Sequence, residues 1–129
     1  MNDDWITLEE GRYYAVQAYL VTTDGAAVAL ENPHIDVVTG RFGKRYLKGG
    51  CLVQNFLMIE LLEDHDELDI MLDLGGEYKY LMEKPDIQGG KVFSPQVRSS
   101  LRFSPTAPWF KMPEADFEER LSQLDVLSG

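Results

Sequence analysis

An alternating segment with a glycine-containing turn, residues 68–82, constrains the fold of this chain more than any other part. Its sequence is LDIMLDLGGEYKYLM, and leucine or isoleucine occupies every second position from Leu68 to Leu74. A period of two places alternate side chains on the same face of a β-strand. We therefore predict a β-hairpin whose two strands are joined by a turn of Gly75, Gly76 and Glu77.

The hydrophobic pattern also fixes the register of this hairpin. A two-residue turn would place Leu72 opposite Lys79, whereas a three-residue turn places apolar residues opposite one another. A shift of one residue moves every side chain of a strand to the other face, so the two registers exclude each other. The three-residue turn predicts the pairs Ile70 with Met82, Leu72 with Tyr80, Asp73 with Lys79 and Leu74 with Tyr78.

Four other segments are rich in β-branched, aromatic or alternating apolar residues, which is typical of strands. They are residues 12–23, 26–31, 34–38 and 97–103. Asp24-Gly25 lies between the first two, and both positions of a type I′ turn require a positive φ. We predict a hairpin with this two-residue turn, and we expect Asn32-Pro33 to end its second strand. The predicted pairs are Val21 with Val28 and Tyr19 with Leu30, and Tyr14, Val16, Ala18 and Leu20 are expected to share one face.

A basic, glycine-rich connection, TGRFGKRYLKGG, occupies residues 39–50. Its spacing differs from that of a phosphate-binding P-loop, because only two residues separate its first two glycines and arginine follows Lys44. We expect a hairpin tip or a bulged loop, with Phe42, Tyr46 and Leu47 turned inward.

Residues 51–64 are apolar enough for a buried strand, although their leucine, methionine, glutamine and glutamate also favour a helix. On a helical wheel the polar residues leave no continuous polar face, so we predict a central strand buried on both sides. The acidic residues 63–67 would then form the turn that follows it. Residues 83–90 and 104–113 carry prolines and glycines and are expected to be connections.

The C-terminal segment has the signals of an amphipathic helix. Pro113 can occupy the first helical position, and the acidic residues that follow it suit the positive end of the helix dipole. Phe117, Leu121 and Leu124 share one face. We therefore predict an α+β fold in a single domain, residues 1–129, with a mainly antiparallel β-sheet of five to seven strands, bent or partly closed, and the C-terminal α-helix packed on it.

The chain carries 22 acidic and 12 basic side chains, a formal net charge of −10. A surface of this sign repels nucleic-acid phosphates and attracts basic partners, so we expect no direct nucleic-acid binding. No acid occurs between Val37 and Ile59 or between Ile87 and Pro113, and we expect the bases of these windows to neutralise acids on neighbouring strands. Without an apolar run of about 18 residues or a basic leader, we expect a cytoplasmic protein that does not bind membranes.

Several residues suggest chemistry, and each has a simpler explanation. His65 lies among the acids of residues 60–73, but the central glycine of an EF-hand is missing, which favours a solvated acidic turn over a divalent-ion site. His34 and Asp36 lie two apart on a predicted strand and so share a face for geometric reasons alone. Cys51, the only cysteine, fits a small core residue better than a nucleophile. We therefore predict no catalytic residue, cofactor or metal.

The acidic surface is the remaining conspicuous feature. If the acids of residues 60–73 and those of the C-terminal helix meet in space, they form a negative patch suited to a basic partner surface. The leading hypothesis is a small acidic, non-catalytic binding protein, an immunity-type or anti-defence inhibitor that occludes a basic site of a partner protein. The predicted partner-binding residues are Glu63, Asp64, His65, Asp66, Glu67, Asp69, Glu114, Asp116, Glu118 and Glu119.

Three alternatives remain open. Solvated charge that only confers solubility is the simplest. A structural or assembly subunit of a phage particle or secretion complex would use exposed strand edges and residues 39–50 to dock on copies of itself, so an oligomer is possible. A small enzyme is the third.

Overall fold

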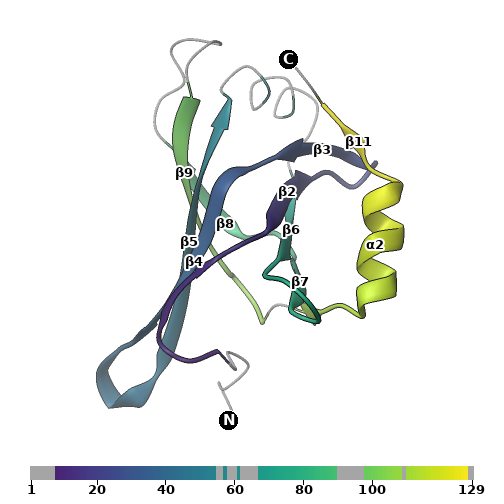
Figure 1. Ribbon diagram of the computed structural model, residues 1–129. Helices are drawn as coiled ribbons and strands as arrows, with labels where there is room; N and C mark the ends of the chain where they lie inside the picture. The colour runs from purple at the N-terminus through teal and green to yellow at the C-terminus, as the bar shows by residue number, and fades with distance from the viewer. Residues whose placement is uncertain are drawn as a thin grey trace.

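The chain folds into two β-sheets and a C-terminal helix in the computed structural model (Figure 1). The structure describes residues 8–54, 57, 61, 67–89, 98–108 and 110–127. The predicted α+β class, with mainly antiparallel strands and a C-terminal helix, is confirmed. The strands are divided between a sheet of five and a sheet of six. No helix among the described residues is long and apolar enough to cross a membrane.

The five-stranded sheet has the order β1-β4-β5-β9-β8, and each pair of neighbours is antiparallel. Its long hairpin of β4 and β5 projects well beyond the rest of the molecule, with a short 3-10 turn at Arg41–Gly43 (Figure 1). The strands of this sheet are β1 (Gly11–Tyr14), β4 (Glu31–Thr39), β5 (Arg45–Gln54), β8 (Asp86–Gly89) and β9 (Arg98–Ser104).

The six-stranded sheet has the order β10-β7-β6-β2-β3-β11, and only β11 runs parallel to its neighbour, β3. Helix α2 (Glu114–Ser122) lies against this sheet, as predicted (Figure 1). The strands are β2 (Gln17–Val21), β3 (Ala26–Ala29), β6 (Asp69–Asp73), β7 (Lys79–Met82), β10 (Phe110–Lys111) and β11 (Asp125–Val126).

The hairpin of β6 and β7 has the predicted register. The structure pairs Leu72 with Tyr80 and Asp73 with Lys79, and it pairs Ile70 with Met82. The N–H of Leu74 donates to the carbonyl of Tyr78 over 2.8 Å, which closes the three-residue turn. Both glycines of this turn have a positive φ, a conformation that glycine adopts at low cost.

The hairpin of β2 and β3 differs from the prediction by one residue. Val21 pairs with Ala27 and Leu20 with Val28, so the turn contains three residues and the predicted two-residue register is wrong. Gly25 has a φ of +94° and is the last residue of this turn. A three-residue hairpin turn uses a glycine at this position, so the Asp-Gly signal located the hairpin correctly but not its length.

Two of the passages from one sheet to the other are corners that fall within predicted strands. The predicted strand 12–23 is interrupted between β1 and β2. Tyr14 and Val16 are exposed, whereas Ala18 is buried, so the prediction that these residues share one face is wrong. The predicted strand 26–31 is interrupted at Leu30, between β3 and β4. Asn32-Pro33 does not end a strand but lies within β4, where a bulge absorbs it.

The main core lies between the two sheets and includes Ile35 from β4 and Ile70 from β6. A second, smaller cluster lies between the six-stranded sheet and α2, where Phe117 has no exposed surface and contacts the buried Met71. Strand β6 is therefore covered on both faces, one by the main core and the other by α2.

The predictions for the central and connecting segments are partly correct. Of residues 51–64, those up to Gln54 belong to strand β5, whereas Leu57 and Leu61 are helical, so the strand prediction is wrong at these two positions. The other residues of this segment lie outside the described part of the chain. Residues 83–90 include strand β8, which was expected to be a connection.

Candidate functional site

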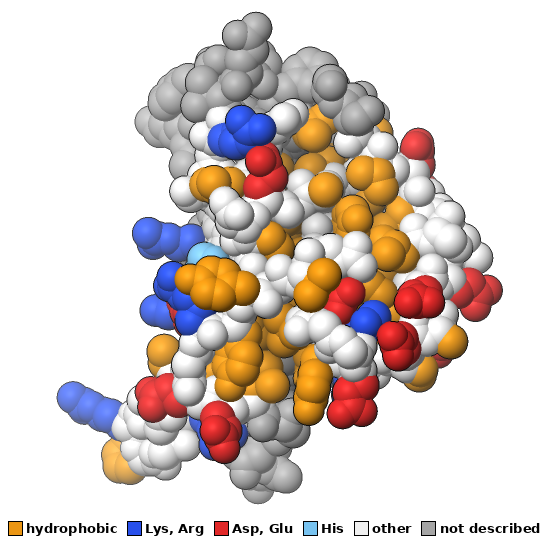
Figure 2. Space-filling model, viewed as in Figure 1, with side chains coloured by type: hydrophobic (Ala, Val, Ile, Leu, Met, Phe, Trp, Pro, Cys, Tyr) orange, Lys and Arg blue, Asp and Glu red, His pale blue; other side chains and the backbone are white. Residues whose placement is uncertain are grey.

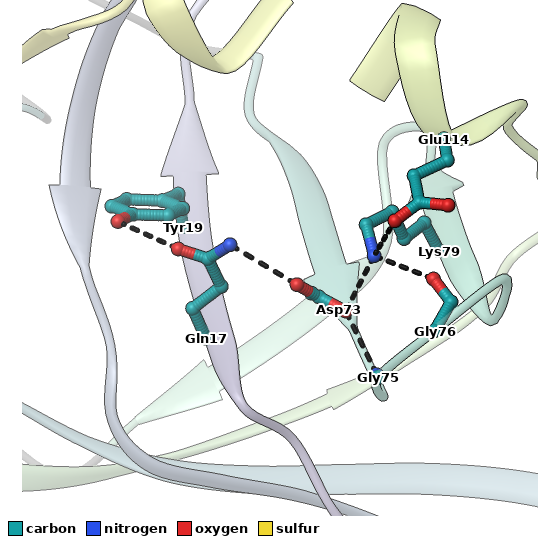
Figure 3. Close-up of polar contacts among 7 residues, drawn as sticks. All are labelled: Gln17, Tyr19, Asp73, Gly75, Gly76, Lys79 and Glu114. Atoms are coloured by element: carbon teal, nitrogen blue, oxygen red, sulfur yellow. Dashed lines mark hydrogen bonds and ion pairs between the residues drawn. The ribbon is translucent and has the colours of Figure 1, made fainter. Parts of the chain in front are cut away.

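A buried ion pair lies under the first turn of α2 (Figure 3). The register of β6 and β7 places Lys79 opposite Asp73, and the Lys79 Nζ lies 3.3 Å from the Asp73 Oδ1, with 7% of each side chain exposed. The ammonium group also donates to the Gly76 carbonyl over 2.6 Å and lies 3.8 Å from Glu114 of α2. The pair therefore connects the β6–β7 turn to the helix.

The carboxylate of Asp73 has further hydrogen-bond partners (Figure 3). It accepts the N–H of Gly75 over 2.8 Å and the side-chain amide of Gln17 over 3.1 Å. The hydroxyl of Tyr19 donates to the Gln17 amide oxygen over 3.2 Å. A buried charge is tolerated when it is paired and hydrogen-bonded in this way. This network fixes α2 against the sheet, and it presents no unpartnered group to a substrate.

The exposed side of α2 is acidic. We call Asp116, Glu118 and Glu119 the acidic face; all three are exposed, and none makes an ion pair with another described residue. Figure 2 shows acidic side chains gathered over the α2 side of the molecule and most of the basic ones over the side of the five-stranded sheet. The charge is thus segregated in space as well as in sequence.

The other predicted partner-binding residues are differently placed. Asp69 of β6 lies 3.9 Å from Arg120 of α2, so a second acid of the 60–73 segment, besides Asp73, approaches the helix. It is largely covered and also accepts the backbone N–H of Lys84 over 3.0 Å. Glu67 is exposed and lies 3.4 Å from the Lys84 Nζ. Glu63, Asp64, His65 and Asp66 lie outside the described residues.

A groove of about 510 Å³ separates α2 from the turn between β2 and β3. We call it the α2 groove. Its floor is apolar, with the buried Val21 and the half-buried Met112 and Leu124, and Asp116 and Glu119 of the acidic face lie on its rim. The full lining is Val21, Thr22, Thr23, Asp24, Gly25, Met112, Asp116, Glu119, Arg120, Gln123 and Leu124.

The outer face of the five-stranded sheet carries a second hollow, of about 750 Å³, which includes His34, Lys48 and Arg102 in its lining. Gly50 forms part of its floor, because a Cβ at this position would lie 2.9 Å from the His34 ring. Arg12 and Asp36 form a two-pronged ion pair here, with contacts of 2.7 and 3.1 Å.

The pKa of the Asp36 carboxyl is lowered by this hydrogen-bonded guanidinium. His34 shares the outer face of β4 with Asp36, but no hydrogen bond joins them among the described contacts, and Arg12 is the partner of Asp36. Lys48 lies opposite Asp36 across β4 and β5, as expected for bases that neutralise acids on a neighbouring strand. The hollow therefore combines bases with a carboxylate that is already paired.

The hairpin tip, defined as residues 40–46, lies at the projecting end of the five-stranded sheet, and residues 41–46 are exposed (Figure 1). Phe42 is fully exposed and Tyr46 is about half exposed, so the prediction that they turn inward is wrong, whereas Leu47 is buried as predicted. The reason is that β4 and β5 extend past the core and leave no apolar surface to cover these rings. Arg41 and Lys44 flank Phe42.

Cys51 is buried in the core, and burial raises the pKa of its thiol from 9.0 to about 12. We therefore expect iodoacetamide at pH 8 to alkylate the folded protein more than about a hundredfold more slowly than the unfolded chain in urea, because the thiolate is the reactive form. Mass spectrometry over time measures both rates, and equal rates would contradict the burial.

The raised pKa also has a consequence for stability at alkaline pH. The unfolded thiol loses its proton near pH 9 and the folded thiol only near pH 12, so the unfolded state is stabilised relative to the folded state in this interval. The contribution of Cys51 to stability is complete below pH 9 and falls as the pH rises toward 12.

Within the described part of the chain, no group of three or more His, Cys, Asp or Glu side chains could hold a metal ion. The acidic turn around His65, where a divalent-ion site was the alternative to solvated charge, lies outside that part. No protein-family model, curated protein or solved structure matches this chain.

Proposed function

We propose that this protein acts by binding, as an immunity-type or anti-defence inhibitor that uses the acidic face of α2 to cover a basic site of another protein. The observation that carries this proposal is that Asp116, Glu118 and Glu119 are exposed on one short helix without an ion pair to any described residue. Acids that serve only as internal partners would be paired, as Asp73 is with Lys79.

Rigidity of the acidic face supports the same proposal. The face lies on a helix that Phe117 anchors in the sheet, and Glu114 beside it lies 3.8 Å from Lys79. The backbone that carries these charges is already fixed, so binding has to order only the side chains.

The charges and the α2 groove would contribute differently to binding. Exposed ion pairs contribute about 0.2–1 kcal/mol each, so the acidic face would mainly accelerate association and exclude acidic partners. Most of the affinity would come from apolar contact with the floor of the α2 groove, formed by Val21, Met112 and Leu124.

Neutralising the acidic face tests the proposal. The variant Asp116→Asn, Glu118→Gln, Glu119→Gln keeps the shape of the side chains and removes three charges. The partner for the test is the basic protein that the unaltered chain captures most strongly from lysate of its source cell. We expect the variant to associate with this partner at least about tenfold more slowly than the unaltered chain does. Surface plasmon resonance on the purified pair measures the association rate.

The matched control is Glu9→Gln, Glu10→Gln, Asp86→Asn, which removes the same net charge from exposed positions beside the five-stranded sheet. This control should leave the association rate within about twofold of that of the unaltered chain, because the charges that it removes do not lie on the acidic face. Equal losses for both variants would mean that net charge alone attracts the partner, which contradicts a binding role of the acidic face.

A second candidate function, a subunit of a larger assembly, is favoured by one observation. Phe42 is a large apolar side chain that is fully exposed at the end of a projecting hairpin. Isolated apolar residues are common on surfaces, but an aromatic ring at the most protruding point of a molecule is well placed to enter a pocket of another protein.

A further inference from the structure

We propose that the hairpin tip of one copy of this protein docks in the α2 groove of a second copy, so that copies join head to tail. The proposal rests on the second candidate function and deepens it, because it names both contact surfaces and the partner. Four features of the described residues carry it: the conformation of Phe42, the charge of the tip, the composition of the groove, and the distance between tip and groove.

Phe42 has a φ of +64° and a ψ of 21°, a left-handed conformation that is an outlier for a bulky side chain. Its ring is fully exposed, so no burial within its own chain offsets this conformational cost. The hairpin turn itself uses this left-handed conformation, which glycine or asparagine would adopt at lower cost than phenylalanine. A contact outside the molecule would explain why a phenylalanine ring occupies this position.

The tip is basic. Arg41 and Lys44 lie on either side of Phe42 and Gly43, both are exposed, and neither makes an ion pair with another described residue. The ammonium group of Lys44 lies 5.6 Å from the centre of the Tyr46 ring, so bases and aromatic rings are interleaved here. A receptor for this tip needs an apolar recess with acids around it.

The α2 groove combines an apolar floor with acids on its rim, and Arg120 also lines it. Val21, Met112 and Leu124 form an apolar floor, and Asp116 and Glu119 lie on the rim without ion pairs to other described residues. Its volume of about 510 Å³ lies within the range of about 300–1,000 Å³ found for pockets that enclose small organic ligands. The ring of Phe42 would lie on the floor, with Arg41 and Lys44 against the two carboxylates.

The tip and the groove lie at opposite ends of the molecule (Figure 1). They cannot meet within one chain, and a contact between two different surfaces of identical copies produces a ring or an open filament. Copies with a net charge of −10 repel one another at long range, so the contact depends on local pairs. At about 0.15 M salt the Debye length is about 8 Å, which screens the net charge more than the pairs in contact.

The test uses two variants that each remove one surface. Phe42→Ser removes the ring from the tip, and Asp116→Lys with Glu119→Lys reverses the charge of the groove. Sedimentation velocity at 0.15 M salt is measured over rising concentration to about 1 mM, since a contact this small is expected to be weak. The unaltered chain should form species larger than a dimer, and each variant alone should remain a monomer.

Mixing the two variants gives the decisive measurement. The groove of Phe42→Ser is intact and so is the tip of the charge-reversed variant, so the mixture should form a 1:1 heterodimer and nothing larger. The control Tyr14→Ser removes an exposed aromatic ring away from the tip and should assemble as the unaltered chain does. Circular dichroism confirms that each variant is folded.

Four results would overturn the proposal. The first three are an unaltered chain that stays monomeric throughout, a Phe42→Ser variant that still assembles, and binding of the tip to vesicles of phosphatidylserine without self-association. The fourth is capture of another protein that the Phe42→Ser variant no longer binds but the charge-reversed variant still binds. That result would overturn docking between copies of this chain, whereas the second candidate function, a subunit of a larger assembly, would stand.

Discussion

Replacement of Lys79 by methionine is expected to lower the free energy of unfolding by about 3–5 kcal/mol. The substitution keeps most of the apolar stem and removes the ammonium group, so the Asp73 carboxylate stays buried with its hydrogen bonds but without its counter-charge. An uncompensated buried charge costs far more than a lost surface pair. Urea denaturation at pH 7 measures the change.

Two further variants separate this explanation from a general loss of packing. Adding Asp73→Asn to Lys79→Met should recover much of the loss, because the amide carries no charge and its oxygen can still accept the N–H of Gly75. Lys111→Met removes a lysine from an exposed pair with Glu77 and should cost less than about 1 kcal/mol. A double variant no more stable than Lys79→Met would contradict the electrostatic cause.

The second large effect is expected at Phe117, where replacement by alanine should cost about 3–5 kcal/mol. The ring has no exposed surface and fills the space between α2 and the six-stranded sheet, beside Val21 and Met71. The loss combines the apolar surface with the cavity that remains, and Phe117→Leu should cost less because leucine refills much of that cavity. Urea denaturation gives the magnitude, and amide exchange shows whether α2 loses protection first.

Phe42→Ala is the matched control, since it is the same chemical change at a fully exposed position. It should leave the free energy of unfolding within about 0.5 kcal/mol. A loss below about 1 kcal/mol for Phe117→Ala would mean that α2 is not docked on the sheet in solution. The acidic face would then lack the rigid support on which the proposed function depends.

The contrast between the two hairpins shows what the sequence could predict. In β6 and β7 a shift of one residue would place Leu72 against Lys79, so the hydrophobic pattern selects one register. In β2 and β3 both faces are covered, one by the core and one by α2, and apolar residues occupy nearly every position. The pattern then favours neither register, and the length of the turn could not be derived.

The division into two sheets and the position of Asp69 could not be predicted for a related reason. The corners at Ala15-Val16 and Leu30 lie within apolar segments, where a change of sheet leaves no mark on the pattern. The ion pair of Asp69 with Arg120 joins a strand to a helix that is distant in sequence, and no local rule predicts it. The acids of α2, in contrast, were predictable because helix signals and charges coincide.

The pairing of β11 with β3 has a consequence for folding during synthesis. Asp125 pairs with Ala26, about a hundred residues apart, whereas β2, β4 and β5 find partners close to them in the chain. The edge of β3 therefore stays open while most of the chain is being made. Open strand edges are templates for pairing with other chains, so nascent copies on one messenger RNA are expected to be able to pair through β3 until β11 emerges from the ribosome.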